Sequence, residues 1–418
     1  MSLLVSDGTL LTQDEERRVV EGNLLTEGDQ ILEVGGTEDS ADRSLDATDC
    51  LVIPGLVDGY TRTAHVLLGP PRDQPWADMA EAMASLQSNL TKRDLEVAAA
   101  LAVTEMLASG TTCFLDLFVW EEEVGRAASQ AGIRAHLAWA IEAEEDLPRA
   151  RRFLHKMRGR ERIQPLVGAT GLSQPQSVRP LADLAREEGT RWCLPLSERR
   201  SDVYRFQRET GRRPVEWLER EGLLSPELLA FHGVWLTLNE IRALARNRVP
   251  LIHCPGSNQM TGAGGPMPLP EMLHEGVVVG LGTDSPFLSG SFSLPSAMRA
   301  CGHIQRGTRW DPTIVSTQAL LDLGTRGGAE ALGLGTGRLR AGAPADFVVL
   351  EAGMTSSDPV EETLSLLVYG GRALRVRDVV VAGNLVVEGG KVLAFDLADL
   401  RQRVAEVRRE LGLAHPGD

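Results

Sequence analysis

The chain has 418 residues, 43% of them hydrophobic, so it can bury one large core and a smaller domain beside it. Its formal net charge of −15 is spread along the sequence without any basic stripe, which argues against nucleic acid or an anionic membrane as partner. No apolar run reaches the roughly 18 residues that span a bilayer, and the opening MSLLVSDGTLLT lacks the regions of a secretion signal. We therefore expect a cytoplasmic protein.

The cysteines are scattered and form no CxxC pair, which in an enzyme-sized chain favours reduced thiols over disulfides or structural zinc. There are five of them: Cys50, Cys113, Cys193, Cys254 and Cys301.

Both ends of the chain have the pattern of short strands separated by turns. Residues 1–54 show it first, and it returns in residues 337–395, where VVVAGN and EGGK are typical of hairpin turns. We expect these two segments to form one small β-sandwich domain. Residues 396–418 are expected to form a C-terminal helical tail.

Between these segments, apolar strand-like runs alternate with helical stretches, as in parallel βα units. The segment TKRDLEVAAALAVTEMLASG predicts a helix capped by Thr91 and Asp94, and Thr237 with Glu240 forms a second capping pattern. Eight strands are expected, which predicts a (β/α)8 TIM barrel over residues 55–336. They end near Tyr60, Leu117, Trp139, Thr170, Ser197, Val234, Cys254 and Asp284.

Active sites of such barrels lie at the C-terminal ends of the strands. Glu198, His232, His253 and Asp284 all fall at such ends.

Several segments together resemble the successive signatures of the amidohydrolase superfamily: IPGLVDGYTR, EMLASGTTCFLD, LPLSE, AFHGVWLTLNE, HCPGSN, VGLGTDS and GRLRAGAPADFVVL. The resemblance covers about residues 1–395 and is closest to the branch of adenosine-type and cytosine deaminases and triazine chlorohydrolases. It implies a hydrolase acting on non-peptide C–N bonds of a small nitrogen heterocycle. It also implies a homo-oligomer, because relatives often form one.

In that branch a His-x-His pair, a fifth-strand histidine and an eighth-strand aspartate hold one metal ion. The matching positions here are Tyr60, Arg62, Pro195 and Asp284. Proline offers no donor atom and a charged arginine repels a cation, whereas catalytic zinc needs about three protein ligands. We therefore expect no metal cofactor.

The resemblance also assigns proton-handling roles, to Glu198 on the fifth strand and to His232 on the sixth. With Asp284 they are the candidate catalytic residues, since a carboxylate and an imidazole facing one pocket can perform acid–base work. The alternative is that these residues are retained from an ancestral enzyme and have no catalytic role here. Without a metal to lower the pKa of water from about 15.7 towards 7, a glutamate generates hydroxide poorly, which favours this alternative for deamination itself.

Candidate substrate contacts are Tyr60, Arg62, Trp76 and His253. Arg62 could pair with Asp284 and Glu198, as an organic cation in place of the metal, and so form either an anion site or a structural ion pair. Trp76 follows the first strand, where relatives place residues that cap a substrate ring, although it could equally be a subunit contact.

The remaining candidates each have a structural alternative. His253 could be a packed core residue, and His65 and His136 show no partner spacing, so we treat both as structural. Cys193 shares a strand face with Pro195 and, with His232 and Asp284, could rebuild a metal site, but buried cysteine is common. The fourth-strand segment GATGLSQPQS lacks the substrate-binding histidine often found in the family.

Two functions stay open at this point. One is a deaminase-like or chlorohydrolase-like enzyme with altered or metal-independent chemistry. The other is a non-catalytic paralogue that binds a ligand or serves as a partner subunit. A polar, open pocket would favour ligand binding, whereas a pocket filled by Tyr60 and Arg62 would favour assembly.

Overall fold

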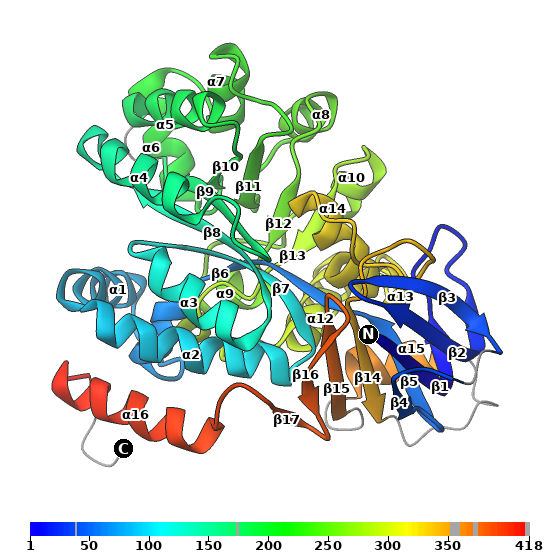
Figure 1. Ribbon diagram of the computed structural model, residues 1–418. Coiled ribbons are helices and arrows are strands. Elements are labelled where there is room, and N and C mark those ends of the chain that lie inside the picture. Colours follow the sequence, from blue (N-terminus) through cyan, green and yellow to red (C-terminus); the bar gives the residue numbers. More distant parts are fainter. Residues whose placement is uncertain (38–39, 173–174, 352–359, 371–374, 414–418) are drawn as a thin grey trace.

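Figure 1 shows the computed structural model, which describes residues 1–37, 40–172, 175–351, 360–370 and 375–413. At its centre lies an eight-stranded sheet whose neighbouring strands are parallel and follow the chain order. The predicted (β/α)8 barrel is therefore confirmed. Its strands are β6 (Leu56–Thr61), β7 (Thr111–Phe118), β8 (Arg134–Ile141), β9 (Ile163–Ala169), β10 (Trp192–Leu196), β11 (Leu228–His232), β12 (Leu251–His253) and β13 (Val279–Leu281).

Helices connect the barrel strands. α2 (Lys92–Ala108) begins with the predicted capping box, in which Thr91 and Asp94 each bond the backbone N–H of the other. α8 (Leu238–Arg246) begins with the second predicted capping box. No helix of the described residues has both the length and the apolarity to cross a membrane.

The other helical segments include short 3₁₀ turns and one π-helical turn, η3. They are η1 (Thr63–Leu68), α1 (Trp76–Asn89), α3 (Glu121–Ala131), η2 (Glu144–Asp146), α4 (Leu147–Met157), α5 (Pro175–Glu187), α6 (Arg200–Thr210), α7 (Pro214–Arg220), α9 (Pro255–Met260), α10 (Leu269–His274), α11 (Pro286–Ser289), α12 (Leu294–Arg309), α13 (Thr317–Asp322), η3 (Leu323–Gly327), α14 (Gly328–Leu332), α15 (Val360–Tyr369) and α16 (Leu397–Glu410).

The two ends of the chain share a second sheet, as predicted, and their strands lie side by side in Figure 1. Antiparallel pairing of β5 with β14 joins the two contributions into one continuous sheet with a hydrophobic cluster of its own. Its strands are β1 (Ser2–Leu11), β2 (Val19–Glu27), β3 (Gln30–Gly36), β4 (Arg43–Asp46), β5 (Cys50–Pro54), β14 (Phe347–Glu351), β15 (Arg375–Val381), β16 (Asn384–Glu388) and β17 (Lys391–Val392).

The C-terminal helix α16 lies in the segment expected to form a tail, and it packs against α2 and η1. Arg401 on α16 lies 3.5 Å from Glu105 on α2, and buried Leu400, Val404 and Val407 face the body of the protein. This helix is therefore part of the folded unit.

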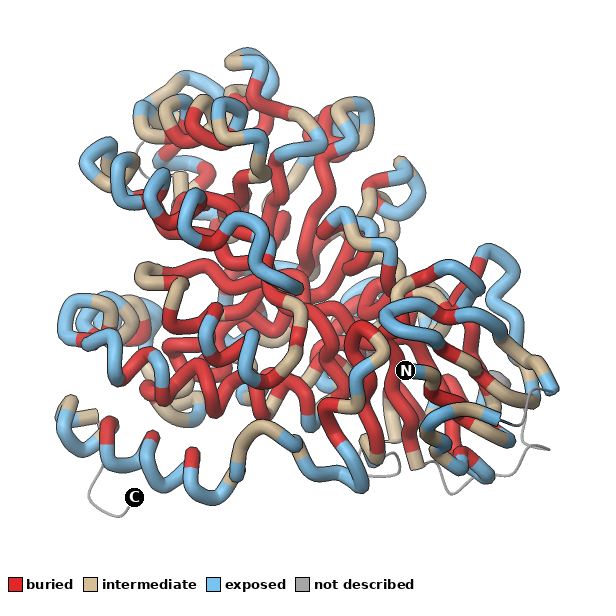
Figure 2. The backbone as a smooth tube through the Cα atoms, in the orientation of Figure 1, coloured by how far each residue is buried: buried red, intermediate tan, exposed pale blue. Residues whose placement is uncertain are grey.

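Buried hydrophobic residues form one large cluster that includes the barrel helices and a separate cluster inside the barrel. In Figure 2 the tube is red through the centre of the molecule, where the barrel strands lie, and pale blue mainly at the periphery. The interior cluster includes Tyr60, Cys193, Leu229 and Phe231. All five cysteines are buried and unpaired. The barrel interior is thus a packed core.

The first and last strands of the barrel are tied together by a buried carboxylate. Asp58 accepts hydrogen bonds from the Thr283 hydroxyl at 2.6 Å and from the Thr283 N–H at 3.0 Å. Beside it, Asp284 N–H donates to Tyr60 C=O at 2.8 Å and Arg62 N–H donates to Asp284 C=O at 3.2 Å. Burial raises the pKa of Asp58 from 3.8 to about 7, although the two hydrogen bonds from Thr283 oppose the shift.

This raised pKa predicts a pH-dependent difference between the wild type and Asp58→Asn. The folded state holds the Asp58 proton more tightly than the unfolded state does between pH 3.8 and about 7. Wild-type stability should therefore fall, relative to the variant, as pH rises through this range, by a few kcal/mol at about 1.4 kcal/mol per pKa unit. Urea unfolding of both proteins across the range measures this difference.

Comparison with the variant isolates Asp58, because Asp116, whose pKa burial raises to about 6, titrates in both proteins. A difference in unfolding free energy that stays constant from pH 4 to 7 would contradict the assignment.

Candidate functional site

A cavity of about 350 Å³ lies at the C-terminal ends of the barrel strands, where the sequence predicted the site. Most of the predicted residues meet there. The ends of β6, β10, β11 and β13 contribute part of the lining, and helices α1 and α6 and the segments after β8 and β9 contribute most of the rest. The lining includes Tyr60, Arg62, Trp76, Pro195, Glu198, Arg199, His232 and Asp284.

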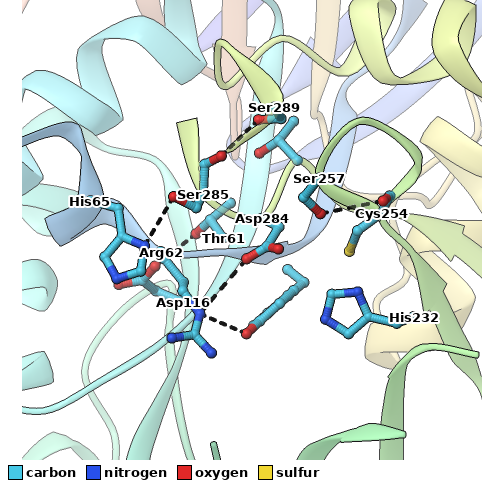
Figure 3. A network of polar contacts seen from close by, with 12 residues as sticks. Thr61, Arg62, His65, Asp116, His232, Cys254, Ser257, Asp284, Ser285 and Ser289 are labelled. Atoms are coloured by element: carbon cyan, nitrogen blue, oxygen red, sulfur yellow. Dashed lines mark hydrogen bonds and ion pairs between the residues drawn. The ribbon is translucent and has the colours of Figure 1, made fainter. Parts of the chain in front are cut away.

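The guanidinium of Arg62 contacts both a phenol and a carboxylate through one nitrogen (Figure 3). Its Nε donates a hydrogen bond to the Tyr60 hydroxyl at 2.8 Å and lies 3.7 Å from Asp284 Oδ1. Burial alone would lower the pKa of Arg62, but Tyr60 and Asp284 raise it above its usual value. Arg62 is therefore a permanent cation, paired with Asp284 as the sequence suggested.

Tyr60 is held in place by aromatic contacts. Its ring stacks on Phe231 with centroids 4.0 Å apart and meets His232 edge-on at 5.7 Å. Burial raises the pKa of Tyr60 well above its usual value, so the phenol stays protonated. These contacts fix the Tyr60 ring in the wall of the cavity, and the ring does not fill the cavity.

Glu198 and His232 face each other across the cavity. His232 Nε2 lies 3.8 Å from Glu198 Oε2, and His232 Nδ1 lies 2.9 Å from the amide oxygen of Asn258. A proton on Nδ1 donates to that oxygen and leaves Nε2 free to accept from a ligand or from Glu198. The two predicted proton-handling residues are therefore together, and Asn258, which the sequence did not single out, orients the imidazole.

Arg199 is a second cation at the cavity that sequence reasoning missed, although it directly follows Glu198. Its guanidinium carbon lies 3.5 Å from the ring centroid of Trp76, and its Nε lies 3.6 Å from Glu198 Oε1. Trp76 thus belongs to the cavity, and the Arg199 contact accounts for part of its surface. The loop after β6 and the loop after β10 meet through this stacked pair.

At the C-terminal ends of three barrel strands, one residue has a left-handed backbone conformation. Ser197, His232 and Asp284 have φ angles of +50°, +72° and +55°. For residues other than glycine this conformation costs free energy, and such residues cluster at functional sites. All three positions carry, or directly precede, a predicted catalytic side chain.

The donor set does not fit the metal that the family resemblance implies. Arg62 carries a positive charge beside Asp284, and Pro195 has no donor atom to offer. Within the described residues, no three side chains of His, Cys, Asp or Glu come together as a metal-binding group, so Cys193, His232 and Asp284 do not form the alternative site. Cys193 instead packs inside the barrel, fully buried.

The other histidines occupy different surroundings. His253 lies outside the cavity lining and is 2% exposed, and burial lowers its pKa to about 3. Neither ring nitrogen of His253 bonds a described residue, so its surroundings match the packed-core alternative. His65, expected to be structural, does line the cavity, and its Nδ1 lies 2.9 Å from the Ser285 hydroxyl.

Residues 51–386 match the amidohydrolase family. A 5-methylthioadenosine/S-adenosylhomocysteine deaminase from Nitratidesulfovibrio vulgaris is 32% identical over 427 residues, 97% of either chain. A 5'-deoxyadenosine deaminase from Methanosarcina barkeri is 30% identical, with 98% of both chains covered.

Solved structures of low sequence identity share the fold. A zinc-bound adenosine deaminase from Xanthomonas campestris superposes with a TM-score of 0.92 at 23% identity, covering 99% of both chains. A zinc complex of atrazine chlorohydrolase from Arthrobacter aurescens gives 0.87 at 20% identity, covering 97% of this chain and 100% of its own. By its matched residues and its 32% identity to a full-length relative, the chain belongs to the amidohydrolase family.

Proposed function

We propose that this amidohydrolase binds a small nitrogen heterocycle of the purine nucleoside class in its C-terminal cavity, without the metal-activated hydrolysis typical of the family. The proposal rests on one observation: the Arg62 guanidinium contacts Tyr60 and Asp284, while the cavity that it lines stays open with a volume of about 350 Å³. Arg62 acts as a fixed organic cation in place of the metal.

The names of the relatives support the ligand class, since they are deaminases of adenosine derivatives. The cavity suits such a ligand, because pockets of about 300–1,000 Å³ hold small molecules between apolar walls and a few polar groups. Trp76 and Phe206 offer aromatic surface, and Glu198 offers a carboxylate to ring or exocyclic N–H groups.

The chemistry of the remaining groups supports binding more than hydrolysis. Glu198 and His232 can exchange protons with a ligand, but neither lowers the pKa of water by the amount a bound metal does. In our proposal, Glu198 and His232 instead bind the ligand by accepting and donating hydrogen bonds. The left-handed backbone at Ser197, His232 and Asp284 keeps this arrangement at a cost in free energy, which is typical of a site in use.

The alternative role as a partner subunit is less well supported. It would be favoured if Tyr60 and Arg62 filled the cavity, but both residues line open space.

Calorimetric titration with adenosine, 5'-deoxyadenosine, 5'-methylthioadenosine and S-adenosylhomocysteine tests the ligand class. We expect saturable binding of at least one of them, weakened about tenfold by Glu198→Gln because a hydrogen bond to a charged group is lost. Glu96→Gln, at an exposed position on α2, serves as the matched control. Ammonia release should stay at background with added zinc and with a chelator.

Two results would overturn this proposal. Ammonia release that zinc stimulates and a chelator abolishes would restore metal-dependent deamination. If none of the four nucleosides binds, the proposed purine nucleoside class of ligand is wrong.

Restoring the family's ligands should create a metal site. In the triple variant Tyr60→His, Arg62→His and Pro195→His, three imidazoles would join Asp284 at one cavity, the number of donors that zinc requires. Mass spectrometric metal analysis should find near-stoichiometric zinc in the triple variant and little in the wild type. Near-stoichiometric metal in the wild type would show that our assignment of Arg62 is wrong.

Charge reversal at Arg62 should destabilise the protein. Arg62→Glu would leave three acidic side chains, including Asp284 and Glu198, around one partly buried space, at a cost of about 2 kcal/mol or more. Arg186→Glu is the matched control, because Arg186 also pairs with an aspartate but is 76% exposed and should cost under about 1 kcal/mol. Equal unfolding free energies for both variants would refute the ion-pair role.

A further inference from the structure

A second cavity, of about 480 Å³, lies at the opposite end of the barrel from the site described above. Its walls come from the beginnings of β8 and β9, the residues just before β10 and the segment after α14. In TIM-barrel proteins this N-terminal end does not carry the active site. Any ligand of this cavity would therefore serve another purpose than the proposed function.

The lining of this basal cavity is strongly cationic. It contains Arg134, Arg160, Arg162 and Arg191 together with His136, and no aspartate or glutamate of the described residues is part of it. The chain as a whole has a net charge of −15. Four guanidinium groups around one space are thus a local reversal of the protein's overall charge.

Two of these arginines are compensated to different degrees. Arg134 is fully engaged, since its Nε and one terminal nitrogen bond both oxygens of Asp346 at 2.7 and 2.9 Å. Arg162 lies 3.3 Å from Glu161, whose side chain is 79% exposed, and its buried Nε finds no partner among the described residues. A surface partner of this kind neutralises little charge.

The other two, Arg160 and Arg191, form no direct ion pair with a described residue. Among the described residues, no carboxylate lies within 4.0 Å of Arg160 or Arg191. Arg191 donates one hydrogen bond to Ala331 C=O at 2.6 Å, while its buried Nε has no described partner. A buried guanidinium with unused donors costs free energy unless an anion compensates it.

The protonation states agree with this geometry. Burial lowers the pKa of Arg191 below its usual value, and the opposing effects of Cys193 and Glu227 do not cancel it. Burial and the nearby Arg191 and Arg134 lower the pKa of His136 to about 3, so its imidazole stays neutral. The positive charge of the cavity therefore comes from the arginines, and some of their N–H donors have no described partner.

The floor of the cavity is apolar. Leu115, Leu166 and Leu229 belong to the barrel interior and form the inner wall, and Leu332 and Leu334 continue it. A bare inorganic ion would leave this surface unused. The arrangement of charged rim and apolar floor suits an anion that carries a hydrophobic group.

We propose that this basal cavity is a binding site for a small organic oxyanion, a carboxylate or a phosphate monoester attached to an apolar group. Its oxygens accept hydrogen bonds from Arg191, Arg160 and Arg162, and its apolar part lies on the leucine floor. The site is independent of the C-terminal cavity and of the function proposed for it.

Benzoate, phenyl phosphate and neutral benzyl alcohol are the probes for calorimetric titration of the full chain. We expect one-to-one binding of at least one anion at millimolar concentration and none of benzyl alcohol, and the tighter anion identifies the preferred head group. Arg191→Met and Arg160→Met should each weaken binding about tenfold or more. Arg160 is exposed, so its variant should fold even if Arg191→Met does not.

Two controls locate the binding. Arg186→Met removes a cation that is 76% exposed and is not part of the cavity lining, and Arg62→Met removes one from the other cavity. Both should bind the anion as the wild type does. The proposal is overturned if neither anion binds, if benzyl alcohol binds equally well, if Arg160→Met and Arg191→Met leave the affinity unchanged, or if Arg62→Met alone abolishes it.

Discussion

Closure of the barrel between its first and last strands is the constraint on which the rest of this structure depends. Asp58 clamps Thr283, and the backbones of Tyr60, Arg62 and Asp284 bond directly across the junction. The same residues then present their side chains to the C-terminal cavity. The interactions that close the fold therefore also build the site.

Electrostatic pairing governs the acidic groups of the C-terminal cavity. Asp284 lies 3.7 Å from Arg62, and Glu198 lies 3.6 Å from Arg199. A guanidinium supplies charge and directed N–H donors, but it cannot coordinate water or lower the pKa of water as a metal does. This difference is the reason why we propose ligand binding without metal-activated hydrolysis for this cavity.

The barrel core separates two cavities of different character. Tyr60 and Phe231 stack beneath the upper cavity, while Leu115, Leu166 and Leu229 form the floor of the basal one. The upper cavity pairs its arginines with carboxylates, whereas two arginines of the basal cavity form no direct ion pair with a described residue. The charge pattern, more than the fold, distinguishes what each end can bind.

The barrel, the shared sheet of both chain ends and the capping of α2 and α8 could all be predicted from the sequence, because periodicity and capping are local properties of the chain. The sequence also identified the strand-end residues Glu198, His232 and Asp284. Only the tertiary structure brought Arg199 onto Trp76, oriented His232 through Asn258 and gathered the basal arginines. These contacts join residues from separate βα units, and no local pattern encodes which side chains meet when the barrel closes.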